Sequence, residues 1–500
     1  MAVAVVFAVP LLLWRDFTPD NELRYLSIAD EAIRNGGIFT FSNHGVPYAD
    51  KPPLYIWLLM ACRRLAGGWT MWLIGLLSFV PAVLSAVFID GLVRGLMPLR
   101  YRLSAFAVLL SSGLYSGCAL VARMDMLMTM FIVLSVREFY RLYVSSERCL
   151  SQRLLFPLYM FLALFTKGPF GIILPVAGIT LFLAVKKELR RWPEFFGFTT
   201  WGVLVLFSAA WFTAVYIEGG ADYLNNLVFH QTVDRAVDAF HHKRPFYYYC
   251  VALLYSLAPW TIIIIGAIAA SLKAKILKSD IAKLFFAMSA ASFFVLSCVS
   301  SKLAIYMLPM FPFMVCLAML HIQRFETAWF IRFGLMLPAA FFSVALPVFV
   351  LLVNYFSLSV YGETGVYMAA TVLTIVGLSS FWMLMCKHRL DVTVCLMSFG
   401  MGLAVFFVGL SVNNLNRTIG YGEECKRAEK LSAQTGARIL VDNSLKNAAD
   451  MDVYLHSFTL IQVNRIDTCH GSDKAVLITG GDRADKLKCR LVTIDKEQIK

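Results

Sequence analysis

Charged residues are scarce in this chain. They make up 15% of its 500 residues, whereas a soluble domain usually has about a quarter. Hydrophobic residues make up 59%, and apolar runs of about 18–25 residues recur along the sequence. This composition excludes an ordinary soluble globule. Runs of that length instead predict an α-helical, polytopic membrane protein.

Acidic residues are fewer than basic ones, 32 against 45, which gives a net charge of +13. A basic excess can indicate nucleic-acid binding. Here, however, the lysines and arginines lie mainly in short clusters between apolar runs, where they set the orientation of membrane helices. We therefore do not expect a nucleic-acid partner.

Cysteine pairs with metal-binding spacing are absent. The eleven cysteines are scattered, without a CxxC pair or a Cys/His cluster, so most are expected to be small buried hydrophobes. Cys425, Cys469 and Cys489 lie in a polar tail and could form one disulfide of undefined pairing. The first 14 residues lack the features of a signal peptide, so we expect a short first helix, although the natural start could lie upstream.

Thirteen apolar segments are predicted to span the membrane, which places the two termini on opposite sides. The segments are 1–14, 70–93, 103–120, 126–144, 153–166, 168–185, 197–217, 247–270, 284–300, 303–320, 332–353, 366–386 and 391–412.

Basic residues fall mainly on one set of alternate loops. By the positive-inside rule these loops and the N-terminus face the cytoplasm, so loops 16–57 and 218–246 and the C-terminal tail lie outside. The clusters are Arg94/Arg100/Arg102, Arg137/Arg141/Arg148/Arg153, Lys186/Lys187/Arg190/Arg191, Lys273/Lys275/Lys278/Lys283, Arg324/Arg332 and Lys387/Arg389, whereas the opposite short loops hold Arg123, Lys167, Arg235, Lys243, Arg244 and Lys302.

The chain changes character at about residue 414. CKRAEKLSAQTG predicts an amphipathic helix that ends at Gly436, and ARILVD, VYLHSFTLIQV and KAVLITGG predict short strands. We therefore divide the chain into a transmembrane domain, residues 1–413, whose first outer loop covers 15–69, and a small extracytoplasmic α/β domain, residues 414–500. The small domain is not expected to hold the chemistry.

The first outer loop is unusually long and polar, and we expect it to carry a site. The stretch NELRYLSIADEAIRN is predicted to form a helix that begins after Asp20. Helical spacing aligns Asn21, Arg24 and Tyr25 on one face, with Glu22 close by. The alternative is an ordinary capped surface helix.

The same loop contains a stiff segment, YADKPP, at residues 48–53. Its two prolines exclude a regular helix and hold Asp50 and Lys51 on a fixed backbone. The alternative is a loop with a snorkelling lysine.

Asp125 stands in the apolar stretch ALVARMDMLMTMFIVL. Because a charge at mid-membrane costs about 2.5–3.5 kcal/mol, this carboxylate is expected to face a cavity or a partner. The alternative is a structural pair with Arg123. Lys167, between two close spans, and Lys302 with Tyr306, on one predicted helix face, suit an anionic headgroup. Interfacial anchoring is their alternative.

Histidines gather in loop 218–246, which ends in HHKRPF. His242 could join Asp50 on a divalent metal, because mixed imidazole and carboxylate ligation suits zinc; a merely polar histidine is the alternative. Taken together, acids and bases gather on the outer face of a bundle that elsewhere avoids charge. This convergence favours a site for an anionic, lipid-linked substrate at which an acceptor is deprotonated.

The order of these motifs resembles the protein O-mannosyltransferase superfamily of membrane glycosyltransferases, especially the bacterial lipid A aminoarabinose transferases. That family has D-E-x-R-Y, (F/Y)-x-(E/D)-K-P-P, an Asp in a T-D-A-L-L-T-like segment, T-K-G, H-x-x-P-F-x-Y-Y and K-L-x-x-Y-x-L-P. The matching segments here are NELRY (21–25), YADKPP (48–53), Asp125, TKG (166–168), HKRPFYYY (242–249) and KLAIYMLP (302–309), within about residues 10–320.

The resemblance implies the C-type glycosyltransferase (GT-C) fold and an inverting enzyme on the outer face of a bacterial inner membrane. Its donor would be a polyprenyl-phosphate sugar of the undecaprenyl type, and its acceptor lipid A, another envelope glycolipid or a protein. A divalent metal, zinc or magnesium, would lie at Asp50 and His242. The implied phosphate ligands are Arg24, Lys51, Lys167, Arg235, Lys302 and Tyr306.

One position departs from the family pattern. The family's first Asp falls on Asn21, whose amide cannot act as a base. We predict Glu22 as the base, then Asp20, with Asp125 as a third candidate. The missing Asp also weakens the expectation of aminoarabinose as the sugar.

Two other functions stay open at this point. One is transfer to an extracytoplasmic protein, as in the O-mannosyltransferases. The other is a transporter or flippase for an anionic lipid. A transporter would be expected to place charges or broken helices at mid-bilayer, whereas the charges here lie at one face.

Overall fold

Apolar helices form the body of the protein, and the computed structural model describes residues 2–145, 149–228, 244–356, 363–386, 389–462 and 475–480. Within these ranges six helices are long and apolar enough to cross a membrane, or up to nine if each sharply bent pair counts as one span. The body helices are α1 (Ala2–Trp14), α4 (Met71–Val93), α5 (Leu99–Ser111), α6 (Gly113–Leu120), α7 (Met124–Val144), α8 (Leu150–Lys167), α9 (Phe170–Val185), α10 (Trp192–Phe195), α11 (Phe198–Asn225), α13 (Tyr248–Ser256), α14 (Thr261–Lys273), α15 (Asp280–Cys298), α16 (Phe311–Ile322), α17 (Trp329–Ser343), α18 (Ala345–Tyr355), α19 (Thr364–Cys386) and α20 (Leu390–Leu410), with 3₁₀-helices η1 (Leu189–Arg191), η3 (Ala304–Met310) and η4 (Gln323–Phe325).

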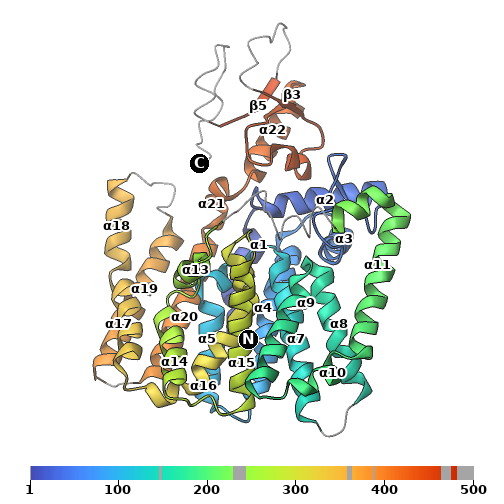
Figure 1. Ribbon diagram of the computed structural model, residues 1–500. Helices are drawn as coiled ribbons and strands as arrows, with labels where there is room; N and C mark the ends of the chain where they lie inside the picture. The colour runs from blue at the N-terminus through green and yellow to red at the C-terminus, as the bar shows by residue number, and fades with distance from the viewer. Residues whose placement is uncertain are drawn as a thin grey trace.

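Helix α16 lies in the interior of this body, and α11 lies at its edge (Figure 1). The apolar segment Ala304–Phe325, which contains α16, is 89% buried, whereas Phe198–Val228, which contains α11, is 22% buried. Both segments are apolar, so the difference lies in what covers them. Protein side chains cover α16, and α11 presents its apolar side chains outward, as a helix in contact with lipid does.

Three of the predicted spans are pairs of helices rather than straight helices. The bend is 65° between α5 and α6, 119° between α13 and α14, and 46° between α17 and α18. The continuous spans predicted at 103–120, 247–270 and 332–353 are therefore wrong as single helices. The cause of the error is physical, because hydropathy reports that a segment is buried but not the direction in which it runs. The total of thirteen spans stays a prediction.

A polar layer covers one end of the body. It consists of α2 (Asn21–Asn35), α3 (Leu54–Ala66) and a short antiparallel hairpin of β1 (Ser42–Asn43) and β2 (Val46–Pro47), in which Asn43 pairs with Val46. Helix α2 has the predicted bounds, because Gly36 adopts the left-handed conformation (φ 74°) that ends a helix. Figure 1 shows this layer at the end of the body opposite α10.

The polar layer is tied to α11. Glu218 of α11 accepts hydrogen bonds from the backbone N–H groups of Ile38, Phe39 and Thr40. The loop predicted to start at residue 218 is therefore partly wrong, because α11 continues to Asn225 past a break at Gly220.

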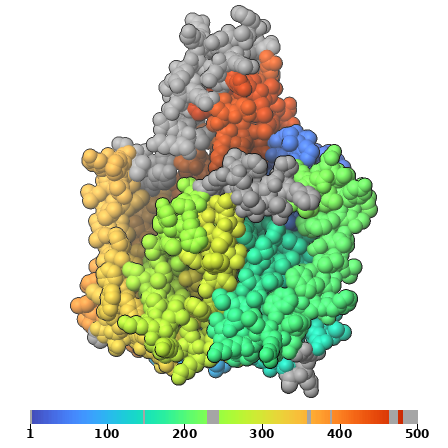
Figure 2. Space-filling view, in the orientation of Figure 1, coloured from blue at the N-terminus to red at the C-terminus, as the bar shows by residue number. Residues whose placement is uncertain are grey.

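A small C-terminal unit stands on the polar layer (Figures 1 and 2). Its three-stranded parallel sheet has the order β4-β3-β5, in which Val441 of β3 pairs with Leu460 and Ile478. The helix predicted to end at Gly436 is present, but VYLHSFTLIQV is a strand only at β4. The boundary at residues 413/414 stays a prediction. The elements are α21 (Val412–Ile419), α22 (Gly422–Thr435), β3 (Arg438–Asp442), 3₁₀-helix η6 (Ala448–Val453), β4 (Thr459–Ile461) and β5 (Ala475–Ile478).

Candidate active site

Asp125 lies in the first turn of α7 and is 2% exposed. Its carboxylate forms an ion pair with Lys167, in the last turn of α8, and lies 3.5 Å from Nε of Arg123. An acid at a helix N-terminus and a base at a helix C-terminus both complement the helix dipole. Two helix ends therefore hold two cations around one buried carboxylate, and the predicted contact with Arg123 is present alongside the one with Lys167.

Tyr306 lies beside this cluster. Nζ of Lys167 is 4.8 Å from the centre of its ring. Lys302 is 4% exposed and donates to the carbonyl of Val299. The helix face predicted for Lys302 and Tyr306 is wrong, because η3 begins only at Ala304 and Lys302 precedes it.

Asp50 and Lys51 lie on the stiff segment before α3. Nζ of Lys51 is 3.2 Å from Oδ2 of Asp50, and the hydroxyl of Tyr48 donates to the same oxygen at 3.2 Å. Lys51 also lies within electrostatic range of Lys167. The segment that the proline pair predicted to be stiff therefore carries a second lysine within electrostatic range of Lys167, and the role of Lys51 as a phosphate ligand stays a prediction.

Tyr25, on the buried side of α2, connects these charges. It lies within electrostatic range of Arg123, Asp50 and Asp125, and burial raises the pKa of its phenol well above the ordinary value. The phenol therefore stays neutral and can only act as a hydrogen-bonding group at physiological pH. Charges from the first outer loop and from the stretch that contains Asp125 thus lie within electrostatic range of one aromatic side chain.

Asp20 and Arg24, also at α2, contact the C-terminal unit. Nη2 of Arg24 donates to Oδ1 of Asn447 at 2.9 Å, and Nδ2 of Asn447 donates to the backbone carbonyl of Asp20 at 3.0 Å. The Asp20 carboxylate is about half exposed, makes no capping hydrogen bond to α2, and lies 3.4 Å from Nζ of Lys446. No motif marks residues 446 and 447, so their contact with this loop could not be predicted from the sequence.

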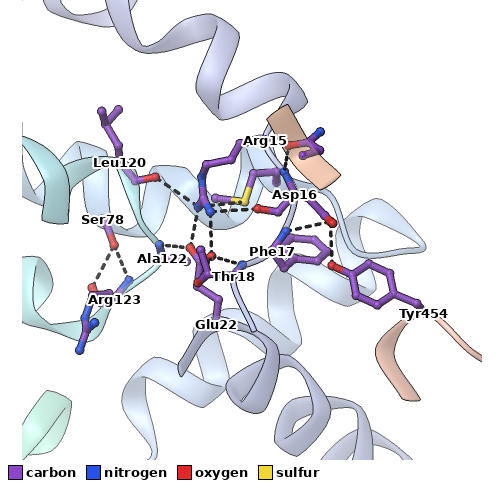
Figure 3. A network of polar contacts seen from close by, with 12 residues as sticks. Arg15, Asp16, Phe17, Thr18, Glu22, Ser78, Leu120, Ala122, Arg123 and Tyr454 are labelled. Atoms are coloured by element: carbon purple, nitrogen blue, oxygen red, sulfur yellow. Dashed lines mark hydrogen bonds and ion pairs between the residues drawn. The ribbon is translucent and has the colours of Figure 1, made fainter. Parts of the chain in front are cut away.

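Glu22 differs from the other predicted acids because its carboxylate is enclosed (Figure 3). Arg15 donates two hydrogen bonds to it, at 2.6 and 2.9 Å. Further donors are the N–H and hydroxyl of Thr18 and the N–H of Ala122. Burial alone would raise the pKa of Glu22, but the Arg15 charge and these bonds hold it below the ordinary value. Glu22 as the base stays a prediction, and this enclosure argues against it.

No role was predicted for Arg15 from the sequence. It is 8% exposed and is the first charge after the N-terminal apolar run. A single arginine at the end of an apolar helix is usually an interfacial anchor, so its pairing with Glu22 had no distinctive signal.

A cleft of about 380 Å³ separates the polar layer from the C-terminal unit. Arg24 and Tyr48 line it from the polar layer, and Asn447 lines it from η6. Because Tyr48 also contacts Asp50, the cleft adjoins the charged cluster. It offers a polar space between the two parts of the molecule.

Arg235 and His242 lie outside the described residues, so their predicted roles cannot be placed in the geometry. Among the described residues no group of three or more His, Cys, Asp or Glu side chains could hold a metal. The described surroundings of Asp50 do not fit a divalent ion by themselves, because the Lys51 ammonium lies where a cation would compete for its oxygen. The metal stays a prediction, and no step is derived through it.

Comparisons with known proteins agree with the resemblance seen in the sequence. The chain is 27% identical over 332 residues to the undecaprenyl phosphate-alpha-4-amino-4-deoxy-L-arabinose arabinosyl transferase of Edwardsiella ictaluri, covering 64% of this chain and 57% of that protein. The same-named protein of Pseudomonas aeruginosa is 28% identical over 52% of this chain and 48% of its own length. The chain thus spans about half to three fifths of these relatives. No family model matches it.

Solved structures give the same answer for the fold. ArnT from Cupriavidus metallidurans bound to undecaprenyl phosphate superposes with a TM-score of 0.75 at 19% identity, over 92% of this chain and 84% of that protein. Its apo structure gives 0.73 over the same shares. Together with the apolar helices, this similarity indicates a multi-pass inner-membrane protein. The chain is therefore similar in sequence to the aminoarabinose transferases and has the GT-C fold of ArnT.

Proposed function

We propose that this protein transfers a sugar, a pentose such as aminoarabinose in the first instance, from undecaprenyl phosphate to lipid A. The observation that carries the proposal is the pair of cations, Arg123 and Lys167, held by Asp125, with Lys51 within electrostatic range of Lys167. They lie at one end of a bundle that shares the fold of a protein crystallised with undecaprenyl phosphate. Lysines and arginines at a membrane surface are suited to a lipid phosphate.

The cluster faces the outer side of the bacterial inner membrane in this proposal. The basic residues Lys186, Arg190 and Arg191 precede or flank α10, and Figure 1 places α10 at the end opposite α2. The positive-inside rule puts that basic end in the cytoplasm. The polar layer, the charged cluster and the C-terminal unit are then extracytoplasmic.

The lysines and arginines would act on the leaving group. As the bond between the sugar and the phosphate breaks, negative charge grows on the lipid phosphate, and fixed cations in a dry site stabilise that charge strongly. Lys167 and Lys51 would take this role. Tyr306 lies beside Lys167, and Lys302 precedes Tyr306 in the chain. Arg123 would act with them, although it was not among the predicted phosphate ligands. Asp125 would hold Lys167 and Arg123 in position.

Asp20 is the best-placed base among the predicted acids. A general base needs a carboxylate that an acceptor hydroxyl can reach. Glu22 is enclosed by five hydrogen bonds and Asp125 by two cations, whereas Asp20 is about half exposed and lies within electrostatic range of Arg123. Attack from the face opposite the phosphate would invert the sugar's anomeric centre. The acceptor would approach through the cleft lined by Arg24.

The direct test is reconstitution of the purified protein in lipid nanodiscs with undecaprenyl-phosphate aminoarabinose and lipid A. Mass spectrometry of the lipid A should show added sugar with the wild type and a large loss of product with Asp20→Asn and Lys51→Ala. A peptide library offered in place of lipid A tests transfer to protein.

The matched control is Lys186→Met. Lys186 also forms an ion pair with an aspartate of another helix, Asp280 at 2.6 Å, but it follows α9 and precedes η1 and α10 in the chain. Its variant should keep wild-type transfer. Donor lipid that moves between leaflets without any sugar transfer would instead support the transporter reading and contradict the proposal.

A further inference from the structure

The connection between α6 and α7 is held by side chains rather than by secondary structure. Val121 (φ −109°, ψ 138°) and Arg123 (φ −141°, ψ 137°) have extended backbones, but no strand pairs with them among the described residues. Such a connection, deep between helices, must satisfy its backbone groups in some other way.

Three side chains from other elements supply those partners (Figure 3). Arg15 donates to the carbonyl of Leu120 at 3.3 Å, and the N–H of Ala122 donates to Glu22 at 2.5 Å. Ser78 of α4 accepts from the N–H of Arg123 at 2.8 Å and donates to its carbonyl at 2.9 Å. Leu120, Ala122 and Arg123 are therefore tied to Arg15, which follows α1, to Glu22 of α2 and to Ser78 of α4.

Burying the Arg15–Glu22 ion pair costs desolvation energy that apolar side chains would not. Its side chains are 7% and 1% exposed, and a buried ion pair is often no more stable than apolar side chains of the same volume. What an apolar pair could not supply is the hydrogen bonds to Leu120 and Ala122. The pair therefore makes sense as a clamp on the connection.

The connection leads directly to charged groups of the proposed site. Arg123 is its last residue, and Asp125, which pairs with Lys167, is in the following turn. Where reacting groups must be aligned, a displacement of about 1 Å can lower the rate about 100-fold.

We propose that Arg15 and Glu22 are positioning residues. Their buried pair clamps residues 120–122, and through this connection it sets where Arg123 meets the donor's phosphate and where Asp125 holds Lys167. The proposal rests on the proposed transferase function. It gives Glu22 a role through the backbone and not as the base.

The test compares Glu22→Gln with the double variant Arg15→Met/Glu22→Leu. The double variant removes both charges and leaves no buried charge unpaired, so it should keep the thermal stability that Glu22→Gln loses. It still lacks the hydrogen bonds to the Leu120 carbonyl and from the Ala122 N–H. We expect kcat of sugar transfer to fall about 100-fold in both, with less change in donor KM. A double variant with wild-type kcat would overturn the proposal, because the pair would then only stabilise the fold.

Hydrogen exchange reads the clamp without any substrate. The amide of Ala122 should exchange about tenfold faster in the double variant, which offers it no acceptor, as expected for the loss of one buried hydrogen bond. In Glu22→Gln the side-chain amide oxygen can still accept this bond, so the exchange should change less. The matched control is Asp30→Asn, which breaks the 3.0 Å ion pair between α2 and Arg63, away from the connection, and there the Ala122 amide should be unchanged. An Ala122 amide as protected in the double variant as in the wild type would overturn the proposal. If the wild type transfers no sugar, the proposed function fails, while the exchange result still decides whether the clamp exists.

Discussion

The two sides of α2 use ion pairs of opposite character. On its inner side Arg15 and Glu22 are 7% and 1% exposed and enclosed by backbone groups. On its outer side His44 of the hairpin meets Asp450 of η6 at 3.1 Å, and this histidine side chain is 35% exposed. The inner pair is shielded from water, whereas the outer pair reaches water through its histidine, which can titrate. The comparison contrasts a fixed ion pair beneath α2 with one on its outer side that responds to pH.

Lys167→Met should produce the largest effect, on the dry side. It removes a cation proposed to hold the leaving phosphate and leaves Asp125 with Arg123 alone. We expect transfer to fall at least about 100-fold, as when a transition-state charge partner is removed. The initial rate of sugar transfer is measured in nanodiscs for Lys167→Met and for the control Lys186→Met. Equal rates in the two variants would contradict a special role for Lys167.

Glu22→Leu should lower the free energy of unfolding more than a change at the His44–Asp450 contact on the outer side of α2. It leaves the Arg15 guanidinium buried without its carboxylate, which typically costs about 3–5 kcal/mol. Asp450→Asn keeps a group that can hydrogen-bond His44, whose side chain is 35% exposed, so this change should cost about 1 kcal/mol or less. Thermal unfolding in detergent, followed by size-exclusion chromatography, compares them. A smaller loss for Glu22→Leu than for Asp450→Asn would reverse the comparison.

Asn447→Ala should affect the acceptor rather than the donor. Asn447 binds both Arg24 and the carbonyl of Asp20 across the cleft. Losing two hydrogen bonds of this kind should raise KM for lipid A about tenfold and leave undecaprenyl phosphate binding unchanged. Asn414→Ala, which loses a contact with Glu363 elsewhere on the surface, is the control. An effect on donor binding alone would argue against the cleft as the acceptor side.

The contact between His44 of the hairpin and Asp450 of the C-terminal unit should become less stable as pH rises. The hydrogen bond to Asp450 raises the pKa of His44 above its ordinary value of 6.5. A raised histidine pKa gives stability that is present below pH 6.5 and lost as pH rises through the raised value. Burial also raises the pKa of Asp452, which acts in the same direction. For Glu31 burial alone would raise the pKa, but its hydrogen bonds lower it, so its contribution is lost only in acid.

The expected change is a few-fold in limited proteolysis of the C-terminal unit between pH 6 and pH 8, because the histidine is partly solvated. In His44→Gln the difference should shrink. If the C-terminal unit of the wild type were instead more resistant to protease at pH 8 than at pH 6, the predicted pH dependence would be refuted.

Local rules predicted much of the polar layer. The bounds of α2 followed from its composition and from a glycine that could end it, and the prolines after Lys51 placed Asp50 and Lys51 on a stiff segment. Asp125 was correctly singled out as a buried charge that needs a partner. Local rules failed for Lys302, because i,i+4 spacing applies only inside a helix, and η3 begins after it.

The sequence by itself determined that this is a polytopic membrane protein whose charges lie mainly outside its apolar runs, because an isolated charge in lipid is costly. It also pointed to the GT-C fold through the order of its motifs. Only the tertiary structure decided which charge meets which. Arg15 rather than the solvent satisfies Glu22, and Asn447 reaches Arg24 from more than four hundred residues away. Such pairings depend on how helices and the C-terminal unit pack, and no local pattern in the chain encodes that contact.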